Sequence, residues 1–296
     1  MTQVVISGSG LNIPPHSISN EELVASYNAF AERFNQEHTE QIAAGEIKEK
    51  PFSSAEFIEK ASGIKSRYVF EKEGALDIDR MCVRFDPRPD DQLSLQAEQG
   101  LVAVREALAQ ANKDPKDVDA LICGCSYYQR AYPALSIEMQ NELGFEGFAF
   151  DLSVACSSAT FAIQTAVDAI QSGRAKCVVV CTPEITSPQS NWRDRDSHFI
   201  FGDAPAALVL EREDTCRATG ALRVLDTRLK TTFSNNIRSN FGYMNIAEDS
   251  DGREADKFFY QQGRRVFKDV CPMVVNTIST HAQDLGLEVT ELRKVW

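Results

Sequence analysis

The sequence predicts an α/β fold in which helices cover a sheet that contains parallel strands. Apolar segments of strand length alternate along the chain with segments whose apolar residues recur at helical spacing. In addition, residues 177–181 (Cys-Val-Val-Val-Cys) are apolar at every position. Such a segment is typical of a strand whose two faces are both covered. Together the two observations favour a layered α/β domain.

The expected elements follow in chain order. A buried strand at residues 4–7 should end in the glycine turn Gly8-Ser9-Gly10, and a charged helix should run from Asn20 to about residue 50. Later helices are expected at residues 94–112, 134–143 and 156–172, the last closed by a glycine. Later strands are expected at residues 119–125, 148–152, 177–181, 199–201 and 206–210, the final two forming one strand or a pair.

Composition excludes several classes of protein. The net charge of −12 opposes nonspecific binding to nucleic acid, whose phosphates are also negative. No apolar run approaches the ~20 residues of a membrane helix, and the first residues lack the pattern of a signal peptide. The eight cysteines contain no C-x-x-C pair and the four histidines are scattered, which argues against a metal site. A cytoplasmic protein that binds neither nucleic acid nor membrane is expected.

An internal repeat indicates two related units. Residues 114–122 follow the predicted helix 94–112 as residues 288–296 follow a second helical segment. Without a gap, four apolar positions of the first helix match four of the second: Leu101, Val104, Leu108 and Ala111 match Val275, Ile278, Ala282 and Leu285. Their spacing is that of a buried helical stripe.

The repeat also suggests a division of the chain. Trp296 aligns with Ile122, which lies inside the strand expected at residues 119–125. We therefore expect a first half at residues 1–212 and the beginning of a second half at residues 213–296. The second unit is expected to be incomplete in this chain.

Cys156 has the most distinctive local setting of the cysteines. The strand expected at residues 148–152 meets a short turn, and the next helix is expected to begin at Cys156. The first turn of a helix offers unpaired N–H groups and the positive end of the helix dipole. This position should lower the pKa of the thiol and favour a thiolate nucleophile. A small buried structural cysteine is an equally good interpretation of the pattern.

Four segments spread over the chain carry recognisable motifs. They are residues 57–67, 151–159 (Asp-Leu-Ser-Val-Ala-Cys-Ser-Ser-Ala), 201–210 (beginning Phe-Gly-Asp-Ala-Pro) and 263–268 (Gly-Arg-Arg-Val-Phe-Lys). In this order they resemble the type III β-ketoacyl-acyl-carrier-protein synthases. The resemblance implies a thiolase-like layered αβαβα fold built from a duplicated unit. It also implies that Cys156 is the nucleophile.

A reaction is implied by the same resemblance. The active cysteine of such enzymes takes an acyl group from acyl-coenzyme A, and the acyl-enzyme condenses with malonyl-acyl-carrier protein. The product is a β-ketoacyl thioester for fatty acid biosynthesis, and no cofactor is implied beyond the coenzyme A thioester, which is a substrate. The family stabilises the enolate with a histidine in a Trp-Leu-His-Gln-Ala-Asn motif and a later asparagine. Neither is present in these 296 residues, so the chain is expected to be inactive in condensation, and His198 and His281 are interpreted as structural.

Further site residues follow from the matched motifs. Tyr132 corresponds to a loop tip that crosses a homodimer and limits the partner's acyl pocket. Phe57 and Arg67 belong to the segment that meets coenzyme A, and Phe57 stands where the family often has tryptophan. Phe267 lies on the helix beside the tunnel mouth. All four are therefore predicted to bind substrate.

Arg264, Arg265 and Lys268 share one helical turn in an otherwise acidic chain. A solvated helix face is the simplest interpretation of such a cluster. Acyl carrier proteins are strongly acidic, so a local basic patch is also suited to docking one.

Two other functions remain open from the sequence. The first is an acyltransferase with the same fold that passes the acyl group of Cys156 to another nucleophile without decarboxylation. The second is a non-catalytic partner subunit that binds acyl chains. Release of carbon dioxide from a malonyl thioester distinguishes condensation from both.

Overall fold

The computed structural model describes residues 2–240 and 257–294, which belong to two compact units. The first unit is Met1–Thr227 and the second is Arg228–Trp296. The division after residue 212 into two related halves stays a prediction. Within the described residues, no helix combines the length and the apolar character needed to cross a membrane.

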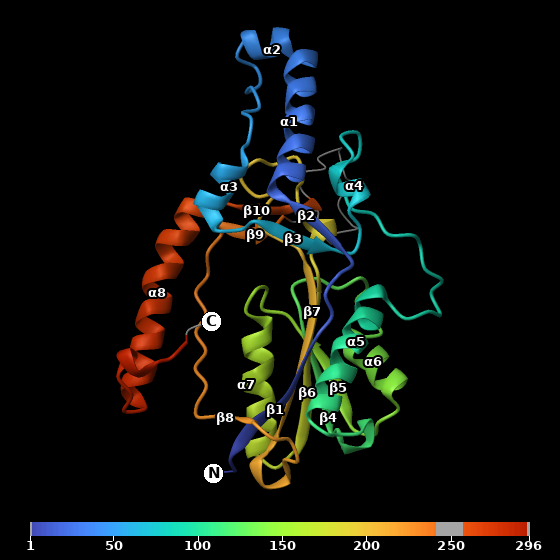
Figure 1. Ribbon diagram of the computed structural model, residues 1–296, viewed down its shortest axis with the longest axis vertical. Coiled ribbons are helices and arrows are strands. Elements are labelled where there is room, and N and C mark those ends of the chain that lie inside the picture. The colour runs from blue at the N-terminus through green and yellow to red at the C-terminus, as the bar shows by residue number, and fades with distance from the viewer. Residues whose placement is uncertain (1, 241–256, 295–296) are drawn as a thin grey trace. The chain divides into compact units, whose positions relative to one another are not determined.

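A six-stranded sheet organises the first unit (Figure 1). Its strand order is β5-β4-β6-β7-β1-β8. The parallel trio β5, β4 and β6 is extended by strands that pair antiparallel. In chain order the strands are β1 (Val4–Leu11), β4 (Ala120–Gly124), β5 (Phe148–Leu152), β6 (Cys177–Ile185), β7 (Asp203–Arg212) and β8 (Leu222–Val224).

Helices cover both faces of this sheet, as the α/β prediction requires. α5 (Leu95–Gln110) and α6 (Leu135–Leu143) pack in the core on one face, and α7 (Ser158–Gln171) packs in the core on the other. Every residue of β4 is buried, which agrees with a central strand of a covered sheet. The predicted bounds of β5 and of α6 agree with the structure to within one residue.

The prediction for β1 was wrong, because the strand continues through its glycines to Leu11. Gly8 and Gly10 are where α5 crosses the strand closely. A Cβ atom on Gly8 would lie 2.1 Å from the carbonyl oxygen of Ala107, and one on Gly10 would lie 2.0 Å from that of Ala103. The glycines therefore provide space for helix packing and do not form a turn.

Two further strand predictions need correction. Residues 199–201 are not a strand, and the only strand in this part of the chain is the ten-residue β7, which begins at Asp203. β6 extends beyond residue 181 to Ile185 because it pairs with β7 along its full length. Long-range pairing of this kind is not encoded in the local pattern of apolar residues.

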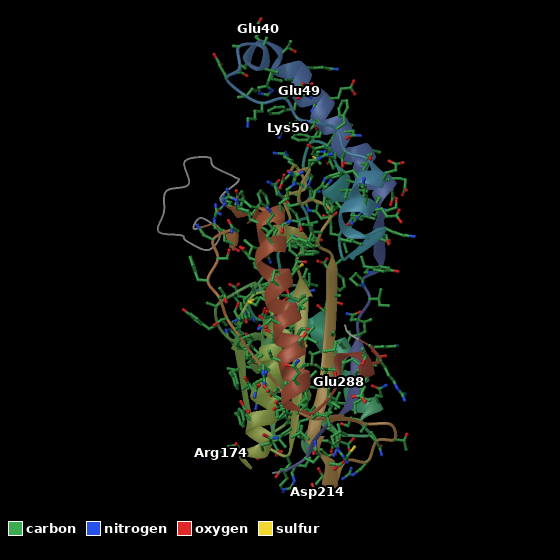
Figure 2. All side chains as sticks on the ribbon, turned by 90° about the vertical axis from the view of Figure 1, so that its left-hand side faces the viewer. Glu40, Glu49, Lys50, Arg174, Asp214 and Glu288 are labelled. Carbon is green, nitrogen blue, oxygen red and sulfur yellow. The ribbon has the colours of Figure 1, made fainter. Side chains whose placement is uncertain are left out.

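The charged region that follows β1 is an arm, and it is not one long helix. α1 (Asn20–Glu37) is followed by the short α2 (Thr39–Ala43), and the chain then returns along α1 (Figure 1). Asn35 pairs with the backbone of Lys50 through two hydrogen bonds of 2.9 Å. Asn28 makes the same pair of bonds with Ser53, at 3.0 and 2.8 Å. Figure 2 labels Glu40, Glu49 and Lys50 at this end of the arm.

A second core joins the base of the arm to the loop before β7. It surrounds the fully buried Trp192 and includes Leu23, Ile58 and Phe199. The elements around it are β2 (His16–Ser19), α3 (Ala55–Ser62), β3 (Ser66–Val69), α4 (Glu73–Leu76) and the 3-10 turn η2 (Ser187–Gln189). Two other 3-10 turns of the first unit are η1 (Pro115–Asp117) and η3 (Glu213–Thr215).

The described part of the second unit has a strand pair, β9 (Ile237–Ser239) and β10 (Phe259–Gln261), followed by α8 (Gly263–Asp284) and the 3-10 turn η6 (Val289–Glu291). Like η1 after α5, η6 begins with a reciprocal capping box. The helical stripes differ, however, because the four positions of the first stripe, on α5 and its C-cap Ala111, are buried whereas Val275 is 63% exposed. Trp296 lies outside the described residues, and the duplication stays a prediction.

Candidate active site

Three parallel strands end at one edge of the sheet, and each contributes one residue to the candidate site. Ser126 follows β4, Cys156 follows β5 after a short turn, and Glu184 is the next-to-last residue of β6. β4 is the middle strand, with Gly124 in register with Leu152 of β5 and Cys123 in register with Cys181 of β6. The carboxyl ends of parallel strands are where ligands bind in sheets of this type.

A tight turn presents Cys156. Ala155 has φ = 48°, a left-handed conformation that is uncommon for a residue with a side chain. The Ser158 hydroxyl stabilises this conformation: it accepts from the N–H of Val154 at 2.9 Å and donates to the carbonyl of Ala155 at 2.7 Å. The turn therefore holds Cys156 in a defined position between a strand and a helix.

The helix begins two residues later than expected. Ser157 is the N-cap of α7 and Ser158 is its first residue, so Cys156 precedes the helix. The field of a helix terminus acts mainly on groups within its first turn. Cys156 therefore lies immediately before the N-cap of α7, next to the positive end of the helix.

The pKa of the Cys156 thiol is raised. Partial burial is the main cause, and the negative charge of Glu184 adds to it, while the cysteine's own backbone N–H acts in the opposite direction. All eight cysteines lie in described parts of the chain and are free, and Cys156 alone among them is exposed. Its accessibility agrees with a nucleophile, and the predicted direction of its pKa shift was wrong.

Glu184 binds the end of β4. Its two carboxylate oxygens accept from the N–H and the hydroxyl of Ser126, at 2.8 and 2.9 Å. Burial raises the pKa of this carboxyl group, and the hydrogen bonds from Ser126 oppose that shift. The Glu184 carboxylate on β6 is therefore fixed in place by Ser126, which follows the neighbouring strand β4.

Two aspartates of the recognised motifs have structural roles. Asp151 at the end of β5 accepts from the N–H groups of Leu135 and Ser136, at 2.8 and 2.9 Å, and so caps α6. Asp203 is buried and accepts from Ser187 through its N–H and its hydroxyl, both at 2.8 Å. Both carboxylates fix the loops around the site.

Tyr132 lies on the loop between β4 and α6 and is 84% exposed. A large aromatic side chain so exposed is available to a partner molecule. Arg130 in the same loop forms an ion pair with the buried Glu138 of α6, whose carboxylate also accepts from Ser94. The loop is thus anchored beside its exposed tip.

Phe57 and Arg195 form a stacked pair. The Arg195 guanidinium lies 3.8 Å from the centroid of the Phe57 ring, and its Nε donates to the carbonyl of Phe52 at 2.8 Å. The ring of Phe199 meets Phe57 edge-on at 6.1 Å. Flat aromatic and guanidinium surfaces are the kind on which purines stack.

Arg67 is buried, with 5% exposure, and its guanidinium is used inside the protein. It donates to the carbonyls of Ile18 and Ser19 and, at 2.6 Å, to the amide oxygen of Asn20. Burial lowers its pKa to about 10. The structure gives Arg67 the role of joining β3 to the start of α1, and its predicted contact with coenzyme A stays a prediction.

His198 is fully buried in the second core, where its ring meets Tyr27 edge-on at 4.8 Å. Burial, with the charge of Arg67 as a further cause, lowers the pKa of His198 to about 3. A neutral ring in this environment agrees with the structural interpretation of this histidine.

The predicted docking residues lie on the first turns of α8. Arg264, Arg265 and Lys268 are exposed, and Phe267 beside them is 69% exposed. This face of α8 therefore combines positive charge with apolar surface. It belongs to the second unit, separate from the unit of Cys156.

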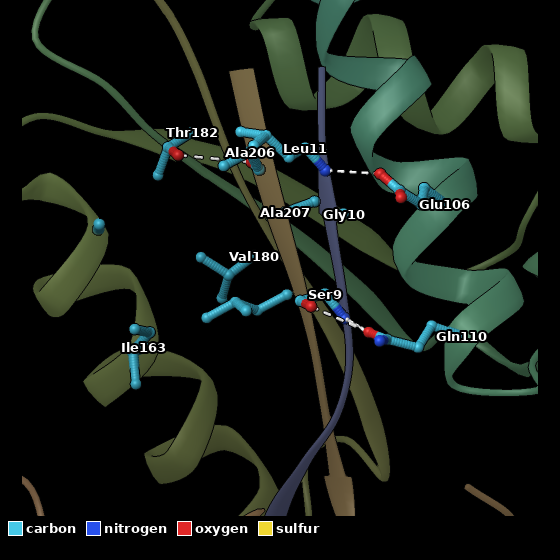
Figure 3. A pocket seen from close by; sticks show the side chains of 12 residues that line it. Ser9, Gly10, Leu11, Glu106, Gln110, Ile163, Val180, Thr182, Ala206 and Ala207 are labelled. Atoms are coloured by element: carbon cyan, nitrogen blue, oxygen red, sulfur yellow. Dashed lines mark hydrogen bonds between the residues drawn. The ribbon is translucent and has the colours of Figure 1, made fainter. Parts of the chain in front are cut away.

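A pocket of about 410 Å³ lies along the C-terminal half of β1 (Figure 3). In this part of β1 no residue pairs with β8, because the pairing between the two strands covers only Val4–Ile6 of β1. Side chains of α5 satisfy the free strand edge: Glu106 accepts from the N–H of Leu11 at 2.7 Å, and Gln110 accepts from Ser9. Cys156 is not among the lining residues, so this pocket is separate from the candidate site.

Comparison with known proteins identifies the family. Residues 150–232 match the model of the 3-oxoacyl-[acyl-carrier-protein] synthase III family. The chain is 48% identical to the β-ketodecanoyl-[acyl-carrier-protein] synthase of Pseudomonas aeruginosa over 271 residues, covering 92% of this chain and 77% of that one. The chain belongs to the β-ketoacyl-acyl-carrier-protein synthase III family.

Other members agree with this assignment. The β-ketoacyl-[acyl-carrier-protein] synthase III of Rhizobium johnstonii is 30% identical over 241 residues, covering 81% of this chain and 67% of that one. A crystal structure of 3-oxoacyl-(acyl carrier protein) synthase III from Pseudomonas aeruginosa is similar in fold, with a TM-score of 0.70 at 20% identity. The alignment covers 98% of this chain and 73% of that one. The thiolase-like fold predicted from the motifs is therefore confirmed.

Sequence reasoning missed several residues of this synthase site. Ser126, Ser158, Glu184 and Arg195 were not singled out. Ser158 closes the turn that presents Cys156, Arg195 stacks on Phe57, and Ser126 and Glu184 bind each other at the ends of β4 and β6. For Glu184 a signal was available, because a carboxylate at the end of an otherwise apolar buried strand is costly without a purpose. Ser126 offered no such signal, since its role depends on a neighbouring strand.

Proposed function

We propose that this protein is an acyltransferase that starts β-ketoacyl synthesis by accepting an acyl group from acyl-coenzyme A on Cys156. The observation that carries the proposal is the accessible thiol of Cys156 on a constrained turn, in a member of the synthase III family. The Cys156 thiolate attacks the thioester carbonyl, the acyl–sulfur bond to coenzyme A breaks, and coenzyme A leaves as a thiolate that takes up a proton from water. The thioester itself provides the activation, so no cofactor is needed.

The raised pKa of Cys156 is consistent with this role. A thiol with a high pKa is a stronger nucleophile once ionised, although a smaller fraction is ionised at neutral pH. Acylation is therefore expected to accelerate as pH rises through the neutral range. Phe57 and Arg195 provide a stacking surface suited to the adenine of the donor.

Octanoyl-coenzyme A is the donor that we propose. The similar Pseudomonas aeruginosa protein is named for a β-ketodecanoyl product, which consists of an octanoyl group lengthened by one two-carbon unit. Malonyl-acyl-carrier protein is the proposed second substrate, and the exposed basic residues of α8 are the proposed docking site for its acidic carrier. Within the described residues, the accessible Cys156 on its turn supports the acylation half of the reaction.

The experiment is to incubate the protein with octanoyl-coenzyme A and to locate the acyl group by mass spectrometry of peptides. We expect an octanoyl adduct on Cys156 and release of coenzyme A. Cys82, Cys216 and Cys271 are partly accessible and serve as internal controls. An adduct confined to one of these three, with Cys156 unmodified, would contradict the proposal.

We also propose a homodimer. β5 is an edge strand of the sheet, and it carries two stacked phenylalanine rings, Phe148 and Phe150, whose centroids are 6.4 Å apart. Phe148 is 41% exposed. An open strand edge with apolar side chains is suited to pairing with a second copy. Tyr132, on the loop that leads to α6, would then reach the acyl pocket of that copy.

Replacement of Tyr132 by alanine tests its predicted role in selecting chain length. If the ring closes a partner's acyl pocket, Tyr132→Ala should favour donors longer than octanoyl in a competition between acyl-coenzymes A. The change expected is about tenfold in relative kcat/KM, since one or two methylene groups are worth roughly 1–3 kcal/mol. Tyr68→Ala, which removes a half-exposed tyrosine ring elsewhere on the surface, is the control. An unchanged profile in a folded Tyr132→Ala protein would refute the pocket role.

A further inference from the structure

The turn that presents Cys156 is fastened at its exit by α7. The Ser158 hydroxyl accepts from the N–H of Val154 at 2.9 Å and donates to the carbonyl of Ala155 at 2.7 Å. Its oxygen also lies 3.3 Å from the carbonyl oxygen of Cys125, the residue after β4. Because α7 packs on one face of the sheet, this end of the turn is held from that face.

Tyr128 fastens the entrance of the same turn. Its phenol hydroxyl donates to the carbonyl of Leu152, the last residue of β5, at 2.5 Å. Its ring packs against the core that includes α5 and α6, on the other face of the sheet. Burial raises the pKa of Tyr128, and the charges of Cys125 and Asp151 add to this shift, so the hydroxyl keeps the proton that it donates. The turn is therefore held at both ends, from opposite faces of the sheet.

Tyr128 is itself held in place by Gln96, the second residue of α5. The Gln96 side chain is fully buried; it donates to the carbonyl of Tyr127 at 2.7 Å and accepts from the N–H of Gln129 at 2.9 Å. In return, the Gln129 side chain accepts from the N–H of Gln96 at 2.9 Å. Both neighbours of Tyr128 are thus bonded to the start of α5, which gives the phenol hydroxyl a defined position.

We propose that Tyr128 is a positioning residue for Cys156, which directs the thiol by holding the carbonyl of Leu152. With Leu152 fixed at the entrance and Ser158 at the exit, the residues between them must follow a tight path, on which Ala155 has φ = 48°. Without the bond at the entrance the turn can relax, and attack on a thioester carbonyl depends strongly on the orientation of the nucleophile. The importance of Tyr128 for catalysis rests on the proposed function of Cys156.

Tyr128→Phe keeps the ring in the core and removes only the hydroxyl. We expect the maximal rate of coenzyme A release from octanoyl-coenzyme A, measured in a single turnover, to fall by about ten- to a hundredfold. The donor concentration that gives half of this rate should change by less than about twofold, because the proposed stacking surface of Phe57 and Arg195 is intact. A residue that only stabilised the fold would lower the melting temperature without dividing the two kinetic constants in this way.

Hydrogen exchange of the backbone amides reports on the turn without any donor. Hydrogen bonds join the N–H of Val154 to the Ser158 hydroxyl and the N–H of Ser157 to the carbonyl of Val154. A third joins the N–H of Ser158 to the carbonyl of Ala155. In Tyr128→Phe these amides should exchange about three to ten times faster, as expected when one supporting hydrogen bond is lost. Exchange along the paired strands β4 and β6 should be unchanged.

Tyr68→Phe is the control, since it removes the hydroxyl of a half-exposed ring on β3 and should change neither measurement. Slower maximal release and faster exchange of the turn in Tyr128→Phe, with Tyr68→Phe unchanged, support the proposal. A folded Tyr128→Phe protein with the wild-type maximal rate or the wild-type exchange of the turn overturns it, as do equal changes in both variants. Tyr128→Leu, which also lacks the hydroxyl, decides in the same way if the phenylalanine variant does not fold. If the wild-type protein takes up no octanoyl group, the proposed function fails, and the exchange measurement alone decides whether Tyr128 holds the turn.

Discussion

Cys156→Ala is expected to reduce the release of coenzyme A from octanoyl-coenzyme A by more than about a thousandfold, because loss of a covalent nucleophile removes the acyl-enzyme pathway. The side chain is exposed and supports no other group, so the free energy of unfolding should change by less than about 0.5 kcal/mol. Coenzyme A release is measured with a thiol reagent, and stability by denaturation in urea.

The conservative variant sharpens this result. Cys156→Ser keeps the size of the side chain, but a hydroxyl is a far weaker nucleophile than a thiolate at neutral pH. It should lose activity as Cys156→Ala does. If either variant retains more than a tenth of the wild-type rate with a native melting temperature, another residue must accept the acyl group.

Gly10→Ala should destabilise the protein by about 3 kcal/mol or more, at the upper end of the usual cost of overpacking. The new Cβ would lie 2.0 Å from the carbonyl oxygen of Ala103 and 2.7 Å from the backbone nitrogen of Ala107. Both atoms belong to the backbone of α5, so no side-chain rotation relieves the clash. Either α5 must move away from β1 or the strand must distort.

Unfolding in urea, followed by the fluorescence of the buried Trp192, measures this effect. Gly263→Ala is the matched control, since its Cβ would meet its nearest neighbour at 3.7 Å, an ordinary contact distance. That variant should be close to neutral. A Gly10→Ala protein as stable as the wild type would show that α5 does not pack on β1 as closely as described.

Local patterns were sufficient to predict much of the fold. β5 and α6 lie within one residue of their predicted bounds, and Cys156 lies at the expected junction between a strand and a helix. The failures have a common physical origin in neighbours distant in sequence. β1 continues through Gly10 because α5 crosses it, and Arg67 is buried because it binds the carbonyls of β2.

In the candidate site, too, the features that could not be predicted depend on residues distant in sequence. The motif around Cys156 identified the nucleophile, but the charge beside it comes from Glu184 on another strand. The local pattern of residues also could not show that the helix begins at Ser158. Residue chemistry was readable from the sequence, whereas the electrostatic environment of the site depended on the fold.

The asparagine pairs of the arm bear on how this region can change during evolution. Asn28 and Asn35 lie two helical turns apart on α1 and fasten the returning chain at Ser53 and Lys50. The segment between α2 and Lys50 is thus a loop whose ends are already fixed. Doubling the length of such a loop costs only about 0.6 kcal/mol of closure entropy. Insertions and deletions between Ala43 and Lys50 should therefore be tolerated, while the two asparagines keep the base of the arm in register.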